Sequence, residues 1–342
     1  MAEAPIIIGL NAVIVAVTEE EPRVLTVVPT QEAPGVWTEA AGAPPALPFG
    51  PLDPAGDDTL QLGLRRWVKE QTGLELGYVE QLYTFGNRDR EPAERLGEAR
   101  VVSVAYLALV REEQPSAASG ARWLPWYRFL PWEDWRDGRP ALLETVIAPA
   151  LERWVEAAPT AAARHARRER TDIAFGLGGA TWDGERVLER YELLYEAGLA
   201  LERAWDERLR GQRNGDARRA AKPLALPAEA LPGLAMAFDH RRILATALGR
   251  LRGKIRYRPV VFELLSEPFT LLQLQRAVEA LAGLRLHKGN FRRLLEHSGL
   301  VEGTGRQRAS TGGRPAELFH FRREVLRERP APGVGLPGLR RE

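Results

Sequence analysis

The hydrophobic and polar residues between positions 269 and 321 follow a pattern that predicts two short helices and then a β-hairpin. Thr270 is a typical N-cap of the first helix, and Gly283 is a typical residue to end it. Between them, apolar residues recur at the spacing of one helix face, at Leu271, Leu274, Ala277, Val278 and Leu281. After a short turn, the second helix is expected over residues 288–297.

The second predicted helix has an apolar face and a basic face. Its polar side chains, which remain free to meet a partner, are Lys288, Asn290, Arg292 and Arg293. The hairpin has a tip rich in Gly, Arg, Ser and Thr over 303–315 and a returning strand of alternating character over 317–321. Arg306, Arg308 and Arg314 flank this tip. The order predicts a winged helix-turn-helix, with the second helix in a DNA major groove and the wing along a phosphate backbone.

A basic helix is also compatible with an ordinary solvated surface, and the distribution of charge bears on that alternative. Residues 239–342 hold 21 Lys and Arg against 10 Asp and Glu, whereas the rest of the chain holds 27 against 36. Such asymmetry indicates a nucleic-acid-binding segment joined to a part with another task. We therefore expect double-stranded DNA as a partner, with RNA binding or protein docking as a weaker alternative.

Length and composition set the class of protein. With 342 residues, the chain is long enough for two or three domains, and 44% hydrophobic and 27% charged residues are typical of a soluble protein. The absence of cysteine excludes disulfides and thiolate metal sites. No apolar run approaches a membrane span, and the apolar start lacks the basic region of a signal peptide. We expect a cytoplasmic protein without a membrane partner.

The first half of the chain alternates between strand-like and helical patterns. Strands are expected over 6–17, 23–28, 75–85 and 101–110. Helices are expected over 59–72 and 140–157, an extended aromatic-rich segment over 125–131, and loops over 31–51 and 88–100. This order predicts an α+β fold, a mixed sheet with helices packed on it.

The middle of the chain is expected to connect two domains. Residues 158–170 are predicted to be a linker or a helix extension, residues 182–210 one strongly periodic helix, and residues 211–232 a linker. The C-terminal domain begins with a helix over 239–255, capped by Asp239, and a short helix over 259–265. The predicted divisions are a sensing domain at 1–157, a helical connector at 158–232, the winged helix-turn-helix at 233–329 and a disordered tail at 330–342.

Residues 58–74, DTLQLGLRRWVKEQTGL, resemble the Nudix box, G-x5-E-x7-R-E-U-x-E-E-x-G-U with U aliphatic. Aligning its last Gly with Gly73 matches Arg66 and Glu70 to family positions, and Asp58 takes the place of the upstream Glu. Trp67 and Gln71 occupy two further Glu positions. In the family these carboxylates hold Mg²⁺, which prefers a shell of hard oxygens. The resemblance implies the scaffold of a Nudix hydrolase without its metal cage, hence no catalytic residues and no enzyme.

Two alternatives remain for this half of the chain. The helix over 59–72 is also compatible with an amphipathic helix that carries no site, and an active hydrolase would need replacement carboxylates, for which the candidates are Glu91, Glu94 and Glu98 in the charged loop. The aromatic residues of the second half are candidates either for stacking on an adenine ring or for the core. The candidate effector-binding residues are Arg66, Glu70, Tyr83 and Phe85.

Four short motifs extend the resemblance over nearly the whole chain: FDH at 238–240, FTL at 269–271, NFRR at 290–293 and GRPA at 313–316. With them the chain resembles the Nudix-related transcriptional regulators of NAD metabolism, of the NrtR type and, in its tryptophan-rich first domain and extra middle segment, of the NadQ type. The resemblance implies a homodimeric repressor of NAD-biosynthesis genes that binds a palindromic operator. The repressor that the resemblance implies needs no cofactor and senses ADP-ribose, NAD or ATP. The block at 172–210 departs from the shorter NrtR layout and leaves the effector open.

Overall fold

The computed structural model describes residues 5–18, 20–29, 43–87, 99–116, 119–213, 227, 230–308 and 315–334. A mixed sheet forms the first part of the chain, with the order β4-β5-β1-β2-β6 and with β3 paired to β1. Its strands are β1 (Ile6–Thr18), β2 (Glu21–Thr26), β3 (Phe49–Pro51), β4 (Tyr78–Phe85), β5 (Arg100–Leu109) and β6 (Arg122–Pro125). β1 and β5 are parallel and the other pairs antiparallel, so the expected α+β fold is confirmed.

Strand β3 was not predicted, because it lies in the Pro- and Gly-rich stretch that we expected to be a loop. Its residues pair with Gly9, Leu10 and Asn11 of β1, and they owe their extended form to that partner rather than to their own sequence. The charged loop predicted at 88–100 lies largely outside the described residues, and so do Glu91, Glu94 and Glu98.

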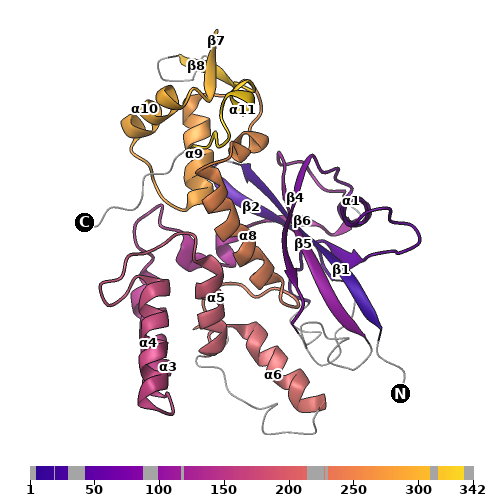
Figure 1. Cartoon of the computed structure of the whole chain (residues 1–342), viewed down its shortest axis with the longest axis vertical. Coiled ribbons are helices and arrows are strands. Elements are labelled where there is room, and N and C mark those ends of the chain that lie inside the picture. Colours follow the sequence, from indigo (N-terminus) through magenta and orange to yellow (C-terminus); the bar gives the residue numbers. More distant parts are fainter. Residues whose placement is uncertain are drawn as a thin grey trace.

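Helix α1 (Leu60–Thr72) covers one face of the sheet (Figure 1). The Thr59 hydroxyl accepts a hydrogen bond from the Leu62 N–H, and Gly73 ends the helix with φ 77°. Leu64 and Val68 are fully buried against alternate residues of β1, among them Leu10 and Ile14. The helix therefore lies where the sequence predicted it.

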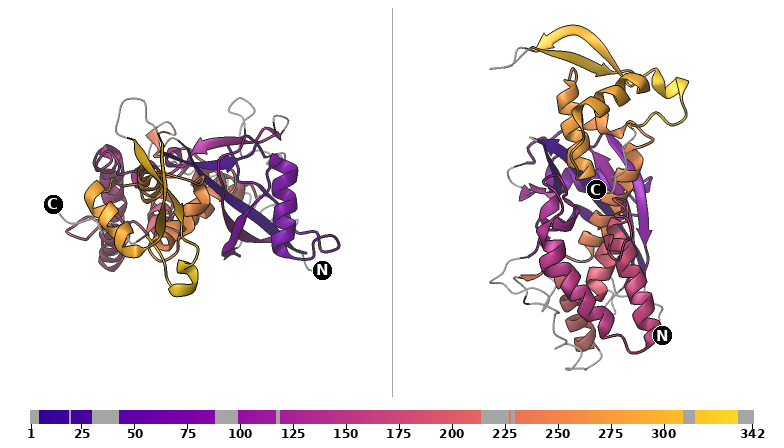
Figure 2. Two further views of the ribbon diagram at one scale, coloured as in Figure 1. Left: turned by 90° about the horizontal axis from the view of Figure 1, so that it is seen from above. Right: turned by 90° about the vertical axis from the view of Figure 1, so that its left-hand side faces the viewer.

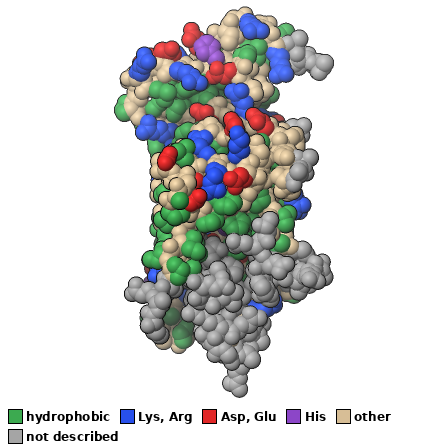
Figure 3. Space-filling model, turned by 90° about the vertical axis from the view of Figure 1, so that its right-hand side faces the viewer, with side chains coloured by type: hydrophobic (Ala, Val, Ile, Leu, Met, Phe, Trp, Pro, Cys, Tyr) green, Lys and Arg blue, Asp and Glu red, His purple; other side chains and the backbone are tan. Residues whose placement is uncertain are grey.

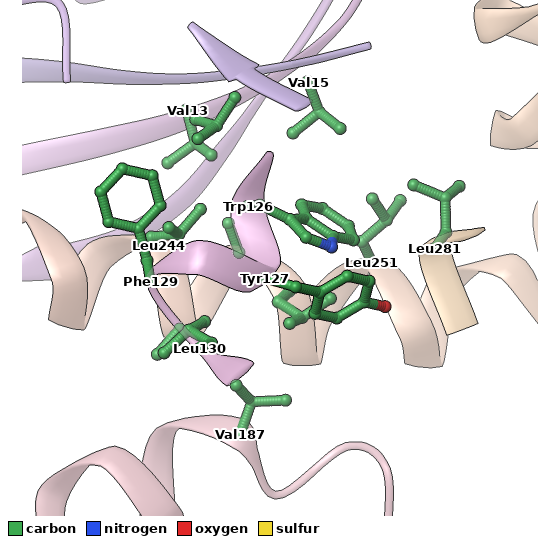
Figure 4. Packing of buried hydrophobic residues seen from close by; sticks show 14 of the residues in the cluster. Val13, Val15, Trp126, Tyr127, Phe129, Leu130, Val187, Leu244, Leu251 and Leu281 are labelled. Atoms are coloured by element: carbon green, nitrogen blue, oxygen red, sulfur yellow. The ribbon is translucent and has the colours of Figure 1, made fainter. Parts of the chain in front are cut away.

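The opposite face of the sheet carries the aromatic segment that we expected to be extended. That expectation was wrong, because β6 is followed by the 3-10 turns η3 (Trp126–Arg128) and η4 (Pro131–Glu133). These turns carry Trp126, Tyr127 and Trp132 into the interior, where each is at most 6% exposed. Figure 4 shows Trp126 and Tyr127 between the strand residues Val13 and Val15 and the helix residues Leu251 and Leu281. For these three rings the core alternative is correct.

Helices fill the middle of the chain, beginning with the π-helical turn η5 (Leu143–Ile147) and continuing with α3 (Ala148–Glu156), α4 (Ala161–Phe175), α5 (Val187–Glu196) and α6 (Leu201–Arg213). Residues 158–170 are therefore mainly the start of a separate helix, α4. The single helix predicted over 182–210 is two helices, because the chain turns at Gly198 with φ 78° and buries Leu199 and Ala200. Helix α5 packs against α8.

The C-terminal part begins with α8 (His240–Ile255) and the 3-10 turn η7 (Val260–Leu264). Asp239 is the N-cap residue of α8, but its side chain makes no capping hydrogen bond. The remaining elements are α9 (Leu271–Ala282), α10 (Lys288–Ser298), β7 (Val301–Arg308), β8 (Ala316–Phe321) and α11 (Val325–Glu328). They form one end of the molecule, and α3 to α6 lie toward the other (Figure 2).

The described start of the expected disordered tail is ordered. Val334 is fully buried and its N–H donates to the Ile255 carbonyl at 2.9 Å, while residues 335–342 lie outside the described part. One hydrophobic core runs without interruption from Val13 in the sheet through α5 and α8 to Phe291 in α10. Within the described residues, no helix is both long and apolar enough to cross a membrane.

Candidate functional site

Helix α10 presents the basic face that its sequence predicted. Phe291 and Leu295 are 3% and 1% exposed and fix the helix on the core. The four polar side chains that the sequence singled out, Lys288, Asn290, Arg292 and Arg293, are all exposed. Among the described residues none of these three cations has an ion-pair partner, whereas Arg66, Arg190 and Arg252 each do. These side chains are therefore available for phosphate or base contacts.

The turn between α9 and α10 is held by a buried carboxylate. Glu279, 1% exposed, accepts hydrogen bonds from the Leu286 N–H at 2.9 Å and the Gln275 amide at 2.8 Å. It also pairs with Arg276 and Arg285 at 3.0 and 3.1 Å. Burial acts to raise the pKa of Glu279, but these donors outweigh it and hold the pKa below its ordinary value. The pairing fixes the angle at which α10 leaves α9.

The first helix of the pair has the caps that its sequence predicted. Thr270 and Gln273 form a reciprocal capping box, and Gly283 ends the helix with φ 71°. The hairpin is attached to this start through two backbone hydrogen bonds between Phe269 and Phe319, at 2.9 and 2.7 Å. The wing is therefore joined by hydrogen bonds to the start of the first helix.

The wing differs from the prediction in the length of its first strand. We expected a tip beginning at residue 303, but β7 continues to Arg308, so that Arg306 and Arg308 lie on a strand and are exposed. Arg314 lies outside the described residues. On the side turned to the viewer in Figure 3, Lys and Arg side chains lie among Asp and Glu side chains rather than in one patch.

Arg66 of α1 is occupied by an intramolecular partner. Its guanidinium donates to both carboxylate oxygens of Asp57, at 2.9 and 2.8 Å, and reaches Glu70 at 3.5 Å. Hydrogen bonds from Arg66 and from the Asp53 N–H lower the pKa of Asp57 to about 2. Sequence alignment pointed to Asp58 instead, which is exposed. Asp57, the partner of Arg66 that the alignment missed, lies one position before Asp58.

Trp67 and Gln71 form a clamp on strand β3. The Gln71 amide accepts from the Phe49 N–H at 3.0 Å and donates to the Phe49 carbonyl at 2.7 Å. The Trp67 indole N–H donates to the Pro51 carbonyl at 2.7 Å, and its ring lies so close to Gly50 that a Cβ there would clash with it. We call these side chains and their hydrogen bonds the β3 clamp.

The β3 clamp does not fit a Mg²⁺ ion. The indole offers an N–H donor where a carboxylate oxygen would be needed, and the neutral Gln71 amide oxygen is already engaged by the Phe49 N–H. Asp57 is neutralised by Arg66, which leaves Glu70 as an exposed carboxylate on the outer face of α1. No group of three or more His, Asp or Glu side chains in the described ranges is arranged to hold a metal ion.

The four predicted effector-binding residues do not lie together. Arg66 and Glu70 are on α1, whereas Phe85 packs in the core on the other face of the sheet and is 6% exposed. Tyr83 is 55% exposed, and its ring centroid lies 5.1 Å from that of Phe85. Asn11 was missed by sequence reasoning, because an amide within a β-rich run carries no distinguishing signal.

Asn11 lies on the same face of the sheet as Phe85. Its neighbours Leu10 and Ala12 face α1, so Asn11 faces the other way, and its strand partners are Ala105 and Phe49. It is 3% exposed, and its Oδ1 has no hydrogen-bond partner among the described residues. A buried acceptor without a donor is unusual in a folded protein.

Comparison with known proteins relates the C-terminal part of the chain to one family. Residues 261–321 match the NrtR DNA-binding winged helix domain. The "ADPR responsive transcriptional repressor NtrR" of Acinetobacter baylyi is 41% identical over 88 residues, which are 26% of this chain. The matched segment spans 35% of that relative's length, so the likeness concerns about a third of it.

Solved structures extend the likeness to the whole fold. The structure of Shewanella oneidensis NrtR bound to a 27mer DNA covers 93% of this chain and 94% of its own, with a TM-score of 0.52 at 22% identity. A MutT/nudix family protein from Enterococcus faecalis covers 94% of this chain and 88% of its own, with a TM-score of 0.50 at 16% identity. Residues 261–321 are therefore similar to the NrtR winged helix domain, and the chain as a whole has the fold of these structures, a Nudix-like sheet domain joined to a winged helix.

Proposed function

We propose that this chain, NrtR-type in its winged helix domain and its fold, is a transcriptional repressor whose Nudix-like domain binds an adenine nucleotide. The observation that carries the proposal is the contrast between two helices. The exposed cations of α10 have no protein partner among the described residues, whereas the Nudix-box positions of α1 are engaged with β3 and Asp57. The first arrangement suits DNA, and the second suits a domain that binds without hydrolysing.

ADP-ribose is the first candidate for the nucleotide, since the Acinetobacter baylyi relative is named as responsive to it. NAD and ATP are the alternatives. The aromatic pair Tyr83 and Phe85 supports a nucleobase position on the sheet face opposite α1, and so does the amide oxygen of Asn11, which has no partner among the residues that the structure describes. An exocyclic amino group could donate to such an oxygen, and an aromatic ring could stack on a base.

The DNA partner is a palindromic operator bound by two winged helices. A helix-turn-helix reads one half-site, and protein two-fold symmetry matches operator symmetry. Genes of NAD biosynthesis are the targets that the resemblance implies, and an operator next to such a gene is the first to test.

The test is a fluorescence-anisotropy titration of the full chain against promoter DNA upstream of its own gene and of NAD-biosynthesis genes. We expect affinity for one promoter to exceed that for a shuffled duplex by roughly 10³-fold or more. ADP-ribose, NAD and ATP are then added in turn, and we expect one of the three to change the affinity for the promoter. Equal affinity for promoter and shuffled duplex would overturn the DNA-binding proposal, and insensitivity to all three nucleotides would overturn the sensor.

A further inference from the structure

Strand β3 is held between two parts of the molecule that are far apart in the sequence. On the side of α1, the β3 clamp binds its backbone at Phe49 and Pro51. On the other side, the Phe49 ring lies 5.2 Å from the rings of both Phe238 and His240. Since β3 has just three residues paired to β1, these contacts are a large share of what fixes its position.

The FDH motif contacts the segment before β3 as well. His240 is fully buried, and its Nδ1 accepts a hydrogen bond from the Leu47 N–H at 2.9 Å. The backbone N–H of Ala237 donates to the Pro45 carbonyl at 2.9 Å. Phe238 has φ 57°, a conformation that L side chains rarely adopt and that persists where the surroundings enforce it. The start of α8 is therefore shaped to fit the chain around β3.

The other end of α8 is attached to the helix-turn-helix. Arg252 donates to the Leu281 carbonyl at 3.3 Å, near the end of α9. The Tyr127 hydroxyl and the Trp135 N–H bind the neighbouring carbonyls of Ala280 and Gly283, at 2.8 and 2.7 Å. In Figure 1, α8 runs from the sheet to α9. Helix α8 therefore connects the residues around β3 with the helix that precedes α10.

We propose that β3 and the FDH motif form the joint through which the Nudix-like domain sets the position of the helix-turn-helix. Trp67 and Gln71, where Nudix hydrolases carry carboxylates, are positioning residues that hold the joint in register. One part of the proposal rests on the proposed function, namely that a bound nucleotide changes the position of the helix-turn-helix through this joint. Because Asn11 pairs with Phe49, a ligand on that face would act on β3 directly.

Hydrogen exchange tests the joint without any nucleotide or DNA. The variant Trp67→Phe/Gln71→Leu removes three hydrogen bonds to β3 and keeps an aromatic ring over Gly50. We expect it to lose protection at the amides of residues 240–246 at the start of α8. The matched control is Trp123→Phe, which removes an indole hydrogen bond of 2.8 Å to the Glu113 carbonyl from a residue of β6, a strand that is not paired with β3. Unchanged protection in the double variant, or equal loss in the control, would overturn the joint.

Thermodynamic linkage tests whether a nucleotide acts on DNA binding through this joint. In the unaltered chain, ADP-ribose is expected to change operator affinity by roughly 5- to 150-fold, the usual range of such coupling. The double variant should bind both ADP-ribose and the operator but lose that change, and the single Trp67→Phe variant should lose part of it. Full retention of the change contradicts the proposal. If the unaltered chain does not respond to ADP-ribose, that nucleotide is excluded as the effector, and the exchange result alone decides the joint.

Discussion

At the scale of residues, geometry separates arginines that hold the fold from arginines that remain available for DNA. Arg190, Arg241 and Arg252 are at most 4% exposed and are paired with Glu133 or Glu202. Arg292 and Arg293 are exposed and have no such partner in the described part of the chain. Composition counts all of them alike, so the structure is needed to separate arginines buried in ion pairs from arginines that are exposed.

Lys288 and the pair Arg292 and Arg293 should respond differently to substitution. Lys288 lies at the N-terminus of α10, where a phosphate is favoured. Lys288→Ala should therefore weaken binding to all DNA sequences alike and reduce the salt dependence of log affinity by about one unit. Arg292→Ala/Arg293→Ala should cost about 1–3 kcal/mol at the operator for each arginine that hydrogen-bonds a base, and should relax the sequence preference at that base. Anisotropy at several salt concentrations measures both.

Arg153→Ala is the matched control, because Arg153 is exposed on α3, away from α10. If the double variant binds the operator with unchanged affinity and specificity, α10 is not the reading helix.

Glu279 predicts a pH dependence of stability. Its folded-state pKa lies below the ordinary value of 4.5, so its contribution is fully present above about pH 4.5 and is lost as the pH falls through the folded-state value. Glu279→Gln should therefore lower the free energy of unfolding at pH 7, and its difference from the unaltered chain should shrink in acid. Urea unfolding from pH 7 down to pH 3 measures this, and a difference independent of pH would contradict it.

At the scale of elements, the sequence predicts best where local signals decide. Helices α1, α9 and α10 lie where expected, because their caps and apolar spacing are local. The break between α5 and α6 was missed because Gly198 sits inside a continuous helical pattern. Strand β3 could not be predicted, since its form depends on pairing with β1. The same limit applies to the site: loss of carboxylates at Trp67 and Gln71 is visible in sequence, whereas the β3 clamp is not.

Helix α1 should not support hydrolysis. Trp67 and Gln71, which hold β3, stand where carboxylate ligands of the metal would be needed. We therefore expect no Mg²⁺-dependent turnover of ADP-ribose beyond background. Chromatography of the products AMP and ribose phosphate measures this turnover. Turnover at ordinary Nudix rates that Glu70→Gln abolishes would refute this. Restoring carboxylates with Trp67→Glu/Gln71→Glu should break the β3 clamp and lower thermal stability rather than yield an efficient enzyme, because a carboxylate would face the Phe49 carbonyl.

At the scale of the whole molecule, the sheet and the winged helix share one core. The buried carboxylate of Glu133 binds Arg190 of α5 at 2.6 Å and Arg252 of α8 at 2.6 Å. Arg190 also donates to carbonyls of Ala174 and Asp183. The helical connector therefore bridges the two parts within one chain.

A homodimer remains our expectation for the assembly, since a palindromic operator offers two half-sites. Because α5 is buried in its own chain, the interface should lie elsewhere. Sedimentation velocity at micromolar concentration should give twice the mass of the 38.1 kDa chain. A monomer both in solution and on operator DNA would contradict this expectation.

Glu133 leaves the ribosome long before the arginines that neutralise it. Arg190 follows 57 residues later and Arg252 119 residues later. Until α8 has been synthesised, burial of that carboxylate is opposed by the cost of removing a charge from water. Burial of Glu133 as an ion pair is therefore completed only when the second half of the chain is present. The proposed nucleotide sensor and the proposed DNA reader are thus completed together, and the two activities are present in equal numbers.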